Sequence, residues 1–120
     1  LSLSYGLRPF ASVKMEIDGQ IHEGTSAGDG QYDAFMKAVR LIYERIGKEL
    51  PQLTDYQVSI PPGGRTDALV ETIITWKYQG KTFRTKGLDV DQTESAIKAT
   101  EKMLNLIEGL NGTDHKALNL

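Results

Sequence analysis

Hydrophobic and polar positions along this chain follow two different periods, and each period occurs twice. Val13, Met15 and Ile17 alternate with polar residues, which is the pattern of a strand with one buried face. Further on, apolar residues recur three and four positions apart, which predicts an amphipathic helix. The stripe of this first helix consists of Phe35, Ala38, Val39, Ile42 and Ile46.

The same order of patterns returns 61 residues later without a gap, so that residues 13–19 align with residues 74–80. Asp18-Gly19 predicts a two-residue hairpin turn, because Gly accepts the positive φ that such a turn requires. Gln79-Gly80 makes the corresponding turn, and a returning strand follows each turn. The stripe of the second predicted helix consists of Ala96, Ala99, Met103 and Ile107.

A further strand is predicted between the two units. Tyr56, Val58 and Ile60 alternate with polar residues, and Pro61-Pro62-Gly63-Gly64 stops the strand. Residues 1–5 resemble this strand and are expected to open the first unit. The prediction is an α+β fold of two repeated strand-strand-strand-helix units, with antiparallel sheet and the helices packed on one face.

Residues 1–110 are expected to form a single domain with pseudo-repeats of about 1–48 and 52–109, and residues 111–120 a disordered tail. Gly47 and Gly109 stand near the predicted helix ends, where a left-handed residue commonly terminates a helix. The chain begins at Leu1 rather than Met, which we interpret as a piece of a longer protein.

Composition narrows the possible functions. The 120 residues are 39% hydrophobic and carry a formal net charge of −2, with lysines and arginines scattered among acids, so no basic stripe predicts nucleic-acid binding. No apolar run approaches a membrane span. The absence of cysteine excludes disulfides, thiol nucleophiles and thiolate metal sites. We therefore expect a cytoplasmic protein without a membrane or nucleic-acid partner.

Candidate catalytic chemistry is sparse. The two histidines, His22 and His115, have no acidic or histidine neighbours at metal-ligand spacing, and we interpret both as surface residues. No nucleophile elbow or phosphate-binding loop occurs. We expect no catalytic residue, no metal site and no cofactor in this chain.

The most informative segment joins the returning strand of the first unit to its helix. In the second unit Asp91 is placed to cap the helix, and Glu94 follows at capping-box spacing, but Gly30 stands at the position of Asp91. A helix start without a side-chain cap is a ready site for an anion such as an amino-acid carboxylate. Asp33 would then face an ammonium group. The alternatives are that Gly30 is an ordinary cap, that Asp29 caps instead, and that Asp33 only complements the helix dipole.

Other conspicuous side chains have two interpretations. Tyr32 either walls a pocket or packs against the helix start. We interpret Trp76 and Tyr78 as core residues on one face of a sheet, in preference to a platform for a ligand. Residues 65–67, Arg-Thr-Asp, favour a solvated loop.

Several motifs in order resemble one family. They are Ala11-Ser12-Val13-Lys14, Asp18-Gly19, residues 28–34 (GDGQYDA), Thr54-Asp55-Tyr56, residues 63–68 (GGRTDA) and residues 87–91 (GLDVD). Together they resemble the C-terminal regulatory domain of 2-isopropylmalate synthase and its relatives, from about residue 1 to 108. The resemblance implies a homodimerising domain that binds the end product of a pathway as feedback inhibitor. It also implies a catalytic barrel, holding a divalent metal, elsewhere in the same chain.

Within the family, residues 28–35 (GDGQYDAF) and 60–64 (IPPGG) look most like citramalate synthase, which joins acetyl-CoA and pyruvate and is inhibited by isoleucine. The resemblance therefore implies isoleucine as effector at a dimer interface, with leucine second as in 2-isopropylmalate synthase. The effector residues it implies are Gly30, Tyr32, Asp33, Leu53, Tyr56, Ile60, Thr66 and Val70. Without the resemblance, Leu53, Ile60 and Val70 would be taken as core. The alternatives are a leucine sensor and a dimerisation module that senses nothing.

Overall fold

The computed structural model describes residues 8–60 and 69–111. The chain divides into two compact units, Leu1–Leu50 and Pro51–Leu120.

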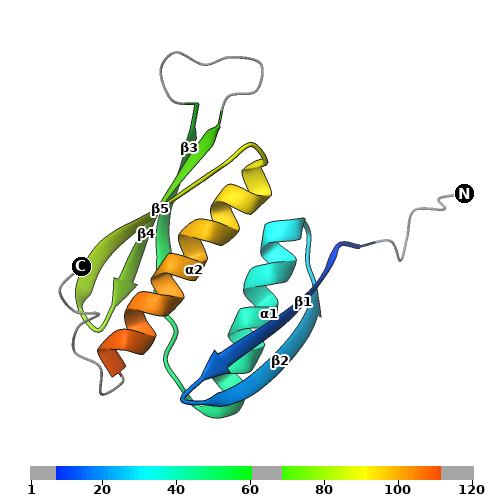
Figure 1. Ribbon diagram of the computed structural model, residues 1–120, viewed down its shortest axis with the longest axis vertical. Helices are drawn as coiled ribbons and strands as arrows, with labels where there is room; N and C mark the ends of the chain where they lie inside the picture. Colours follow the sequence, from blue (N-terminus) through cyan, green and yellow to red (C-terminus); the bar gives the residue numbers. More distant parts are fainter. Residues whose placement is uncertain (1–7, 61–68, 112–120) are drawn as a thin grey trace, which may run out of the picture. The chain divides into compact units, whose positions relative to one another are not determined.

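The first unit is a β-hairpin covered by a helix (Figure 1). Strands β1 (Phe10–Ile17) and β2 (Gln20–Ala27) are antiparallel, with Ile17 opposite Gln20. The predicted turn is confirmed, because Asp18 and Gly19 both have positive φ, 53° and 80°. Helix α1 (Gln31–Ile46) packs on both strands.

Helix α1 buries a wider face than the predicted stripe. Of the predicted residues, Ala38, Val39 and Ile42 are fully buried, whereas Phe35 and Ile46 are only half-buried. The additional buried residues are Ala34, Met36 and Tyr43. The helix ends at Gly47 as predicted: this residue has φ of 70°, and the N–H groups of Gly47 and Lys48 donate to the carbonyls of Glu44 and Tyr43.

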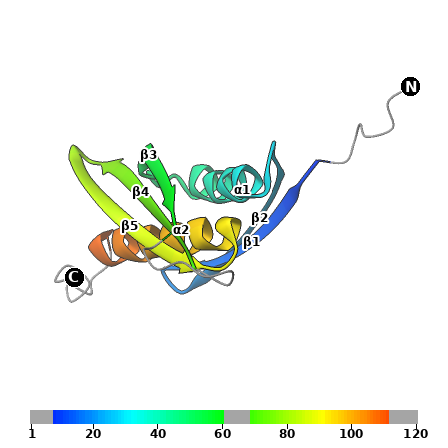
Figure 2. The same ribbon diagram turned by 90° about the horizontal axis from the view of Figure 1, so that it is seen from above.

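The second unit is a three-stranded antiparallel sheet with one helix (Figure 2). Strands β3 (Gln52–Ser59), β4 (Val70–Tyr78) and β5 (Lys81–Asp89) lie in the order β3-β4-β5. Helix α2 (Gln92–Asn111) packs on β4 and β5. The predicted stripe of α2 is confirmed as core, and so are the sheet residues Trp76 and Tyr78.

Helix α2 approaches the sheet closely at Gly87. A Cβ atom on Gly87 would lie 2.0 Å from the Ser95 carbonyl oxygen and 2.7 Å from the Ala99 nitrogen. Polar groups at this contact are paired inside the core. Ser95 Oγ donates to the Gln92 carbonyl at 2.8 Å, and because that uses its only proton, Thr72 Oγ1 is the donor in the 2.5 Å bond between the two hydroxyls.

The α+β fold and the repeat are confirmed. Both helices begin at glutamines 61 residues apart, Gln31 and Gln92, and Gln79 and Gly80 repeat the positive φ values of the first turn. The prediction that Gly109 ends the second helix is wrong, since α2 runs to Asn111. The strand predicted at residues 1–5, the stop at 61–64 and the tail at 112–120 lie outside the described residues.

Candidate functional site

The N-terminus of α1 lacks a side-chain cap. Gly30 is the N-cap residue, its backbone is extended with φ of −150° and ψ of 175°, and no side chain bonds to the first turn from this position. The first helical bond joins the Ala34 N–H to the Gly30 carbonyl. An α-helix leaves its first N–H groups without partners inside the helix, and these groups carry the positive end of the helix dipole. This end of α1 therefore favours a negatively charged group.

The turn 28–30 in front of the helix is held from several directions. The Gly28 N–H donates to the Pro9 carbonyl at 3.0 Å. Gly28 is buried, and a Cβ atom there would lie 2.3 Å from the Ala34 nitrogen. Asp33 Oδ2 accepts the Asp29 N–H at 2.8 Å and lies 3.3 Å from Lys37 Nζ.

Asp29 does not cap the helix, because its side chain pairs with Arg8 and its N–H is bonded to Asp33. The Asp29 N–H, followed by the Lys37 ammonium group, holds the pKa of the Asp33 carboxyl below its usual value, although partial desolvation opposes this. Asp33 is therefore an anion at neutral pH.

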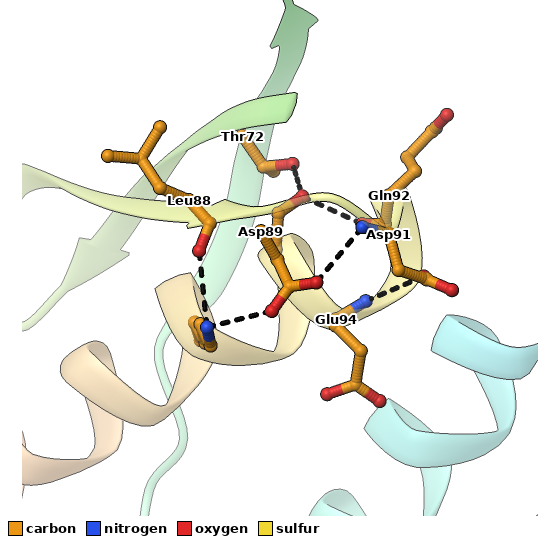
Figure 3. Close-up of polar contacts among 8 residues, drawn as sticks. Thr72, Leu88, Asp89, Asp91, Gln92 and Glu94 are labelled. Atoms are coloured by element: carbon orange, nitrogen blue, oxygen red, sulfur yellow. Dashed lines mark hydrogen bonds and ion pairs between the residues drawn. The ribbon is translucent and has the colours of Figure 1, made fainter. Parts of the chain in front are cut away.

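The corresponding start of α2 is closed by carboxylates (Figure 3). Asp91 Oδ1 accepts the Glu94 N–H at 3.1 Å, so the predicted cap is confirmed. The capping box would also have the Glu94 side chain accept the Asp91 N–H, and this prediction is wrong, since the Asp91 N–H donates to Asp89 Oδ1 at 2.9 Å. Lys98 Nζ lies 2.7 Å from Asp89 Oδ2 and donates to the Leu88 carbonyl at 3.3 Å. In the first unit Gly28 and Gly30 stand where Asp89 and Asp91 stand here.

The Asp89–Lys98 pair predicts a defined dependence of stability on pH. The bond from Lys98 and the Asp91 N–H lower the pKa of Asp89, and the bond to Asp89 raises the pKa of Lys98. The stability from Asp89 is therefore present above its unfolded pKa of about 3.9 and is lost as pH falls through the lower folded pKa. The stability from Lys98 is present below about pH 10.4 and is lost as pH rises through its raised folded pKa.

Thermal melts of the wild type and of Asp89→Asn between pH 2 and 7 check this prediction. The asparagine keeps an acceptor for the Asp91 N–H but has no charge, so its melting temperature should fall less on acidification. Asp55→Asn is the matched control, because Asp55 is exposed in β3, and its melt should follow the wild type. Parallel acid profiles for Asp89→Asn and the wild type would contradict the account.

Strand β3 carries the predicted site residues of the second unit on one face. Leu53 pairs with Trp76 and Tyr56 with Ile74, and both partners are buried on the helix side of the sheet. A β-bulge between Leu53 and Asp55 makes this possible, because residues three apart in a regular strand face opposite sides. The bulge therefore places Leu53 on the same face as Tyr56.

The helix-side face of β3 is largely uncovered, because α2 packs on β4 and β5. Leu53 is 37% exposed, and Ile60, directly after the strand, is 66% exposed, so the alternative that these two are plain core is wrong. Val70 begins β4 opposite Asp89 and is half-buried, while Thr66 lies outside the described residues. Val58 was missed as a site candidate. It is 38% exposed on the same face, opposite Thr72, and its alternation with Tyr56 was the available signal.

The remaining candidates are placed as follows. Tyr32 stacks on Phe35 with ring centroids 6.0 Å apart, and both are half-buried. His22 lies opposite Met15 in the hairpin and is half-buried, so part of it stays exposed at the surface; His115 lies outside the described residues. Within residues 8–60 and 69–111, no group of three or more His, Asp or Glu side chains is arranged to hold a metal ion. No helix in that part of the chain is long and apolar enough to cross a membrane.

A model of the LeuA allosteric (dimerisation) domain matches residues 2–108. The chain belongs to this family. The resemblance inferred from the motifs is thereby confirmed, and the chain corresponds to the regulatory domain of 2-isopropylmalate synthase and its relatives.

Similar proteins carry this LeuA-type domain within longer chains. The 2-isopropylmalate synthase of Methanocaldococcus jannaschii is 32% identical over 103 residues, which are 86% of this chain and 18% of that protein. The 2-isopropylmalate synthase of Aquifex aeolicus is 34% identical over 98 residues, covering 81% and 18%. A protein of Archaeoglobus fulgidus, named as a candidate (R)-citramalate synthase, is 35% identical over 105 residues, covering 86% and 19%. This chain spans about a fifth of the length of these relatives.

Proposed function

We propose that this LeuA-type domain binds a branched-chain amino acid and regulates, by feedback inhibition, the enzyme of which it is part. The proposed effector is isoleucine, with leucine second, and the proposed enzyme is a citramalate synthase that condenses acetyl-CoA with pyruvate. The domain itself takes no part in catalysis. Its proposed partners are a second copy of the domain and a metal-dependent catalytic barrel in the same chain.

The observation that carries this proposal is the difference between the two helix starts. The start of α2 is closed by Asp91 and Asp89, whereas the start of α1 ends in Gly30 and has no side-chain cap. The open start offers N–H donors to a carboxylate, as helix N-termini do for anions. In a family of allosteric domains, an amino-acid carboxylate is the anion that fits.

Each of the two units contains proposed effector residues. Tyr32 and Asp33 adjoin the open start of α1, and the second unit contributes an apolar set that leaves part of its surface exposed. Apolar walls with a few fixed polar groups are what a small ligand site requires. The proposed second-unit residues are Leu53, Tyr56, Ile60, Thr66 and Val70. We assign the site to a dimer interface, where effector binding shifts the domain between states with a coupling on the order of 1–3 kcal/mol.

Calorimetric titration of the purified chain with isoleucine, leucine, valine and lysine tests the proposal. Isoleucine should give the tightest binding and leucine the next. The two affinities should differ by only about 1–3 kcal/mol, because a pocket distinguishes isomers of this size weakly. Lysine should give no heat, since its second ammonium group would enter an apolar pocket. No heat with any of the four at millimolar concentration would overturn the proposal, and leucine ahead of isoleucine would favour a 2-isopropylmalate synthase.

A dimerisation module that senses no ligand is the second candidate. It is favoured by the uncovered apolar face of β3, an edge strand of the described sheet, because an exposed edge invites pairing with another chain. This candidate predicts a dimer whose sedimentation is indifferent to amino acids and a titration without heat. The sensor predicts a dimer that also releases or absorbs heat with isoleucine.

A further inference from the structure

Asp33, the third residue of α1, makes a different contact from Glu94, the third residue of α2. In the second unit the turn before the helix is held by Asp89, which accepts the Asp91 N–H at 2.9 Å from outside the helix. Gly28 occupies that position in the first unit and has no side chain to offer. In the first unit the carboxylate of Asp33 holds the turn from inside the helix, and it accepts the N–H one position earlier, that of Asp29, at 2.8 Å.

The contact to Asp29 dominates the surroundings of this carboxylate. The Asp29 N–H and the Lys37 ammonium group both lie against Oδ2, at 2.8 Å and 3.3 Å. The Asp29 bond is the shorter of the two and the largest cause of the lowered pKa of Asp33, ahead of Lys37. The Lys37 side chain is about two-fifths exposed, and an exposed ion pair four residues apart on a helix stabilises little.

The turn that Asp33 holds is also the turn that leaves the helix start open. Gly28 packs against the backbone of Ala34, and Gly30 contributes no cap. A carboxylate at position 30 would compete with the effector for the N–H groups of the first turn, as Asp91 takes one in α2, whereas one at position 33 reaches the turn without occupying the N-cap position. The first unit thus has an ordered turn and an open N-cap at the same time.

We propose that Asp33 is a positioning residue of the effector site, which acts on bound effector by holding the turn 28–30 and not by an ion pair with the effector's ammonium group. This rests on the proposed function and refines it. It predicts that Asp33 supports the binding of any carboxylate with a suitable branched chain, including one without an amino group.

Two substitutions separate the positioning role from a direct ion pair. Asp33→Ala removes the acceptor for the Asp29 N–H, whereas Asp33→Asn keeps an acceptor oxygen and removes the charge. We expect Asp33→Ala to weaken isoleucine binding about tenfold, the usual scale for losing a hydrogen bond to a charged group, and Asp33→Asn to restore it to within roughly threefold of wild type. The matched control Lys37→Met, which removes the other partner of the carboxylate, should change affinity less than about twofold.

The affinity for a ligand without an amino group separates the two roles. An ion pair with the ammonium group is impossible for such a ligand, whereas the turn 28–30 still has to be held. 3-Methylpentanoate has the carboxylate and side chain of isoleucine without its ammonium group. Asp33→Ala should weaken both ligands by the same factor. Melting curves confirm that each variant is folded at the temperature of the titration.

Three results would overturn the positioning role. The first is that Asp33→Asn and Asp33→Ala lose the same affinity for isoleucine and none for 3-methylpentanoate. The second is that neither variant changes isoleucine binding. The third is that Lys37→Met loses as much affinity as Asp33→Ala. A wild type that binds no amino acid would instead refute the proposed function itself.

Discussion

Gly87→Ala should strongly destabilise the second unit. The new Cβ would lie 2.0 Å from the Ser95 carbonyl oxygen and 2.7 Å from the Ala99 nitrogen, so α2 must move away from β5. These are backbone atoms of a helix and cannot turn aside as a flexible side chain does. Overpacking of this kind costs about 1–3 kcal/mol or more. We expect about 2–4 kcal/mol, or a fall in melting temperature of roughly 10–25 °C.

Urea denaturation and thermal melts measure this loss, and Gly30→Ala is the matched control. The chemical change is the same, but a Cβ atom on Gly30 would meet nothing within 4 Å. The control should cost less than about 1 kcal/mol, because alanine is only a poorer N-cap than glycine. Equal stability of Gly87→Ala and the control would show that α2 does not approach β5 as closely as described.

Gly30→Asp should weaken effector binding strongly while leaving folding intact or improved. The extended backbone of Gly30 accepts any residue, the position has open space around it, and Asp91 at the matching position already caps α2. The new carboxylate would bond to the first turn of α1 and add a few tenths of a kcal/mol of stability. It would also take the donors, and repel the charge, of the effector carboxylate. We expect affinity to fall roughly tenfold to hundredfold, as for the loss of a charged hydrogen bond.

The rise in melting temperature caused by isoleucine measures this effect, since a ligand that binds only the folded state stabilises it. At the same isoleucine concentration, the rise should be markedly smaller in Gly30→Asp than in the wild type. Gly30→Ser is an informative companion, because a serine cap takes a donor but carries no charge, and it should fall between the two. A full ligand-induced rise in Gly30→Asp would show that the effector binds elsewhere.

Much of the fold follows from periodicity in the sequence. The alternation of Val13, Met15 and Ile17 and the stripe around Ile42 identified the hairpin and α1 because their buried residues are apolar. The gap-free repeat then placed Gly30 opposite Asp91, and the structure confirms that one helix start is capped by a side chain and the other is not.

Hydrophobic periodicity could not predict other features, because they depend on contacts between distant parts of the chain. The helix-side faces of β2 and β5 contain glycines at their tightest points, Gly24 and Gly87, where the helix backbone replaces a side chain. A glycine gives no hydrophobic signal, so the sequence of β2, QIHEGTSA, shows no clear alternation. The bulge after Leu53 also depends on pairing with β4, which local sequence does not encode. The roles of Asp33 and Asp89 depend on which N–H group each carboxylate reaches, and spacing alone did not determine that.

The repeat provides an internal control for the central claim, that the open start of α1 binds the effector. Isoleucine titrated into the ¹⁵N-labelled chain should shift the backbone amide resonances of Gly30, Gln31 and Asp33 most. The matching amides of Asp91, Gln92 and Glu94, where carboxylates close the helix start, should shift little. Equal shifts at both helix starts, or the largest shifts away from α1 and the helix-side face of β3, would contradict the account.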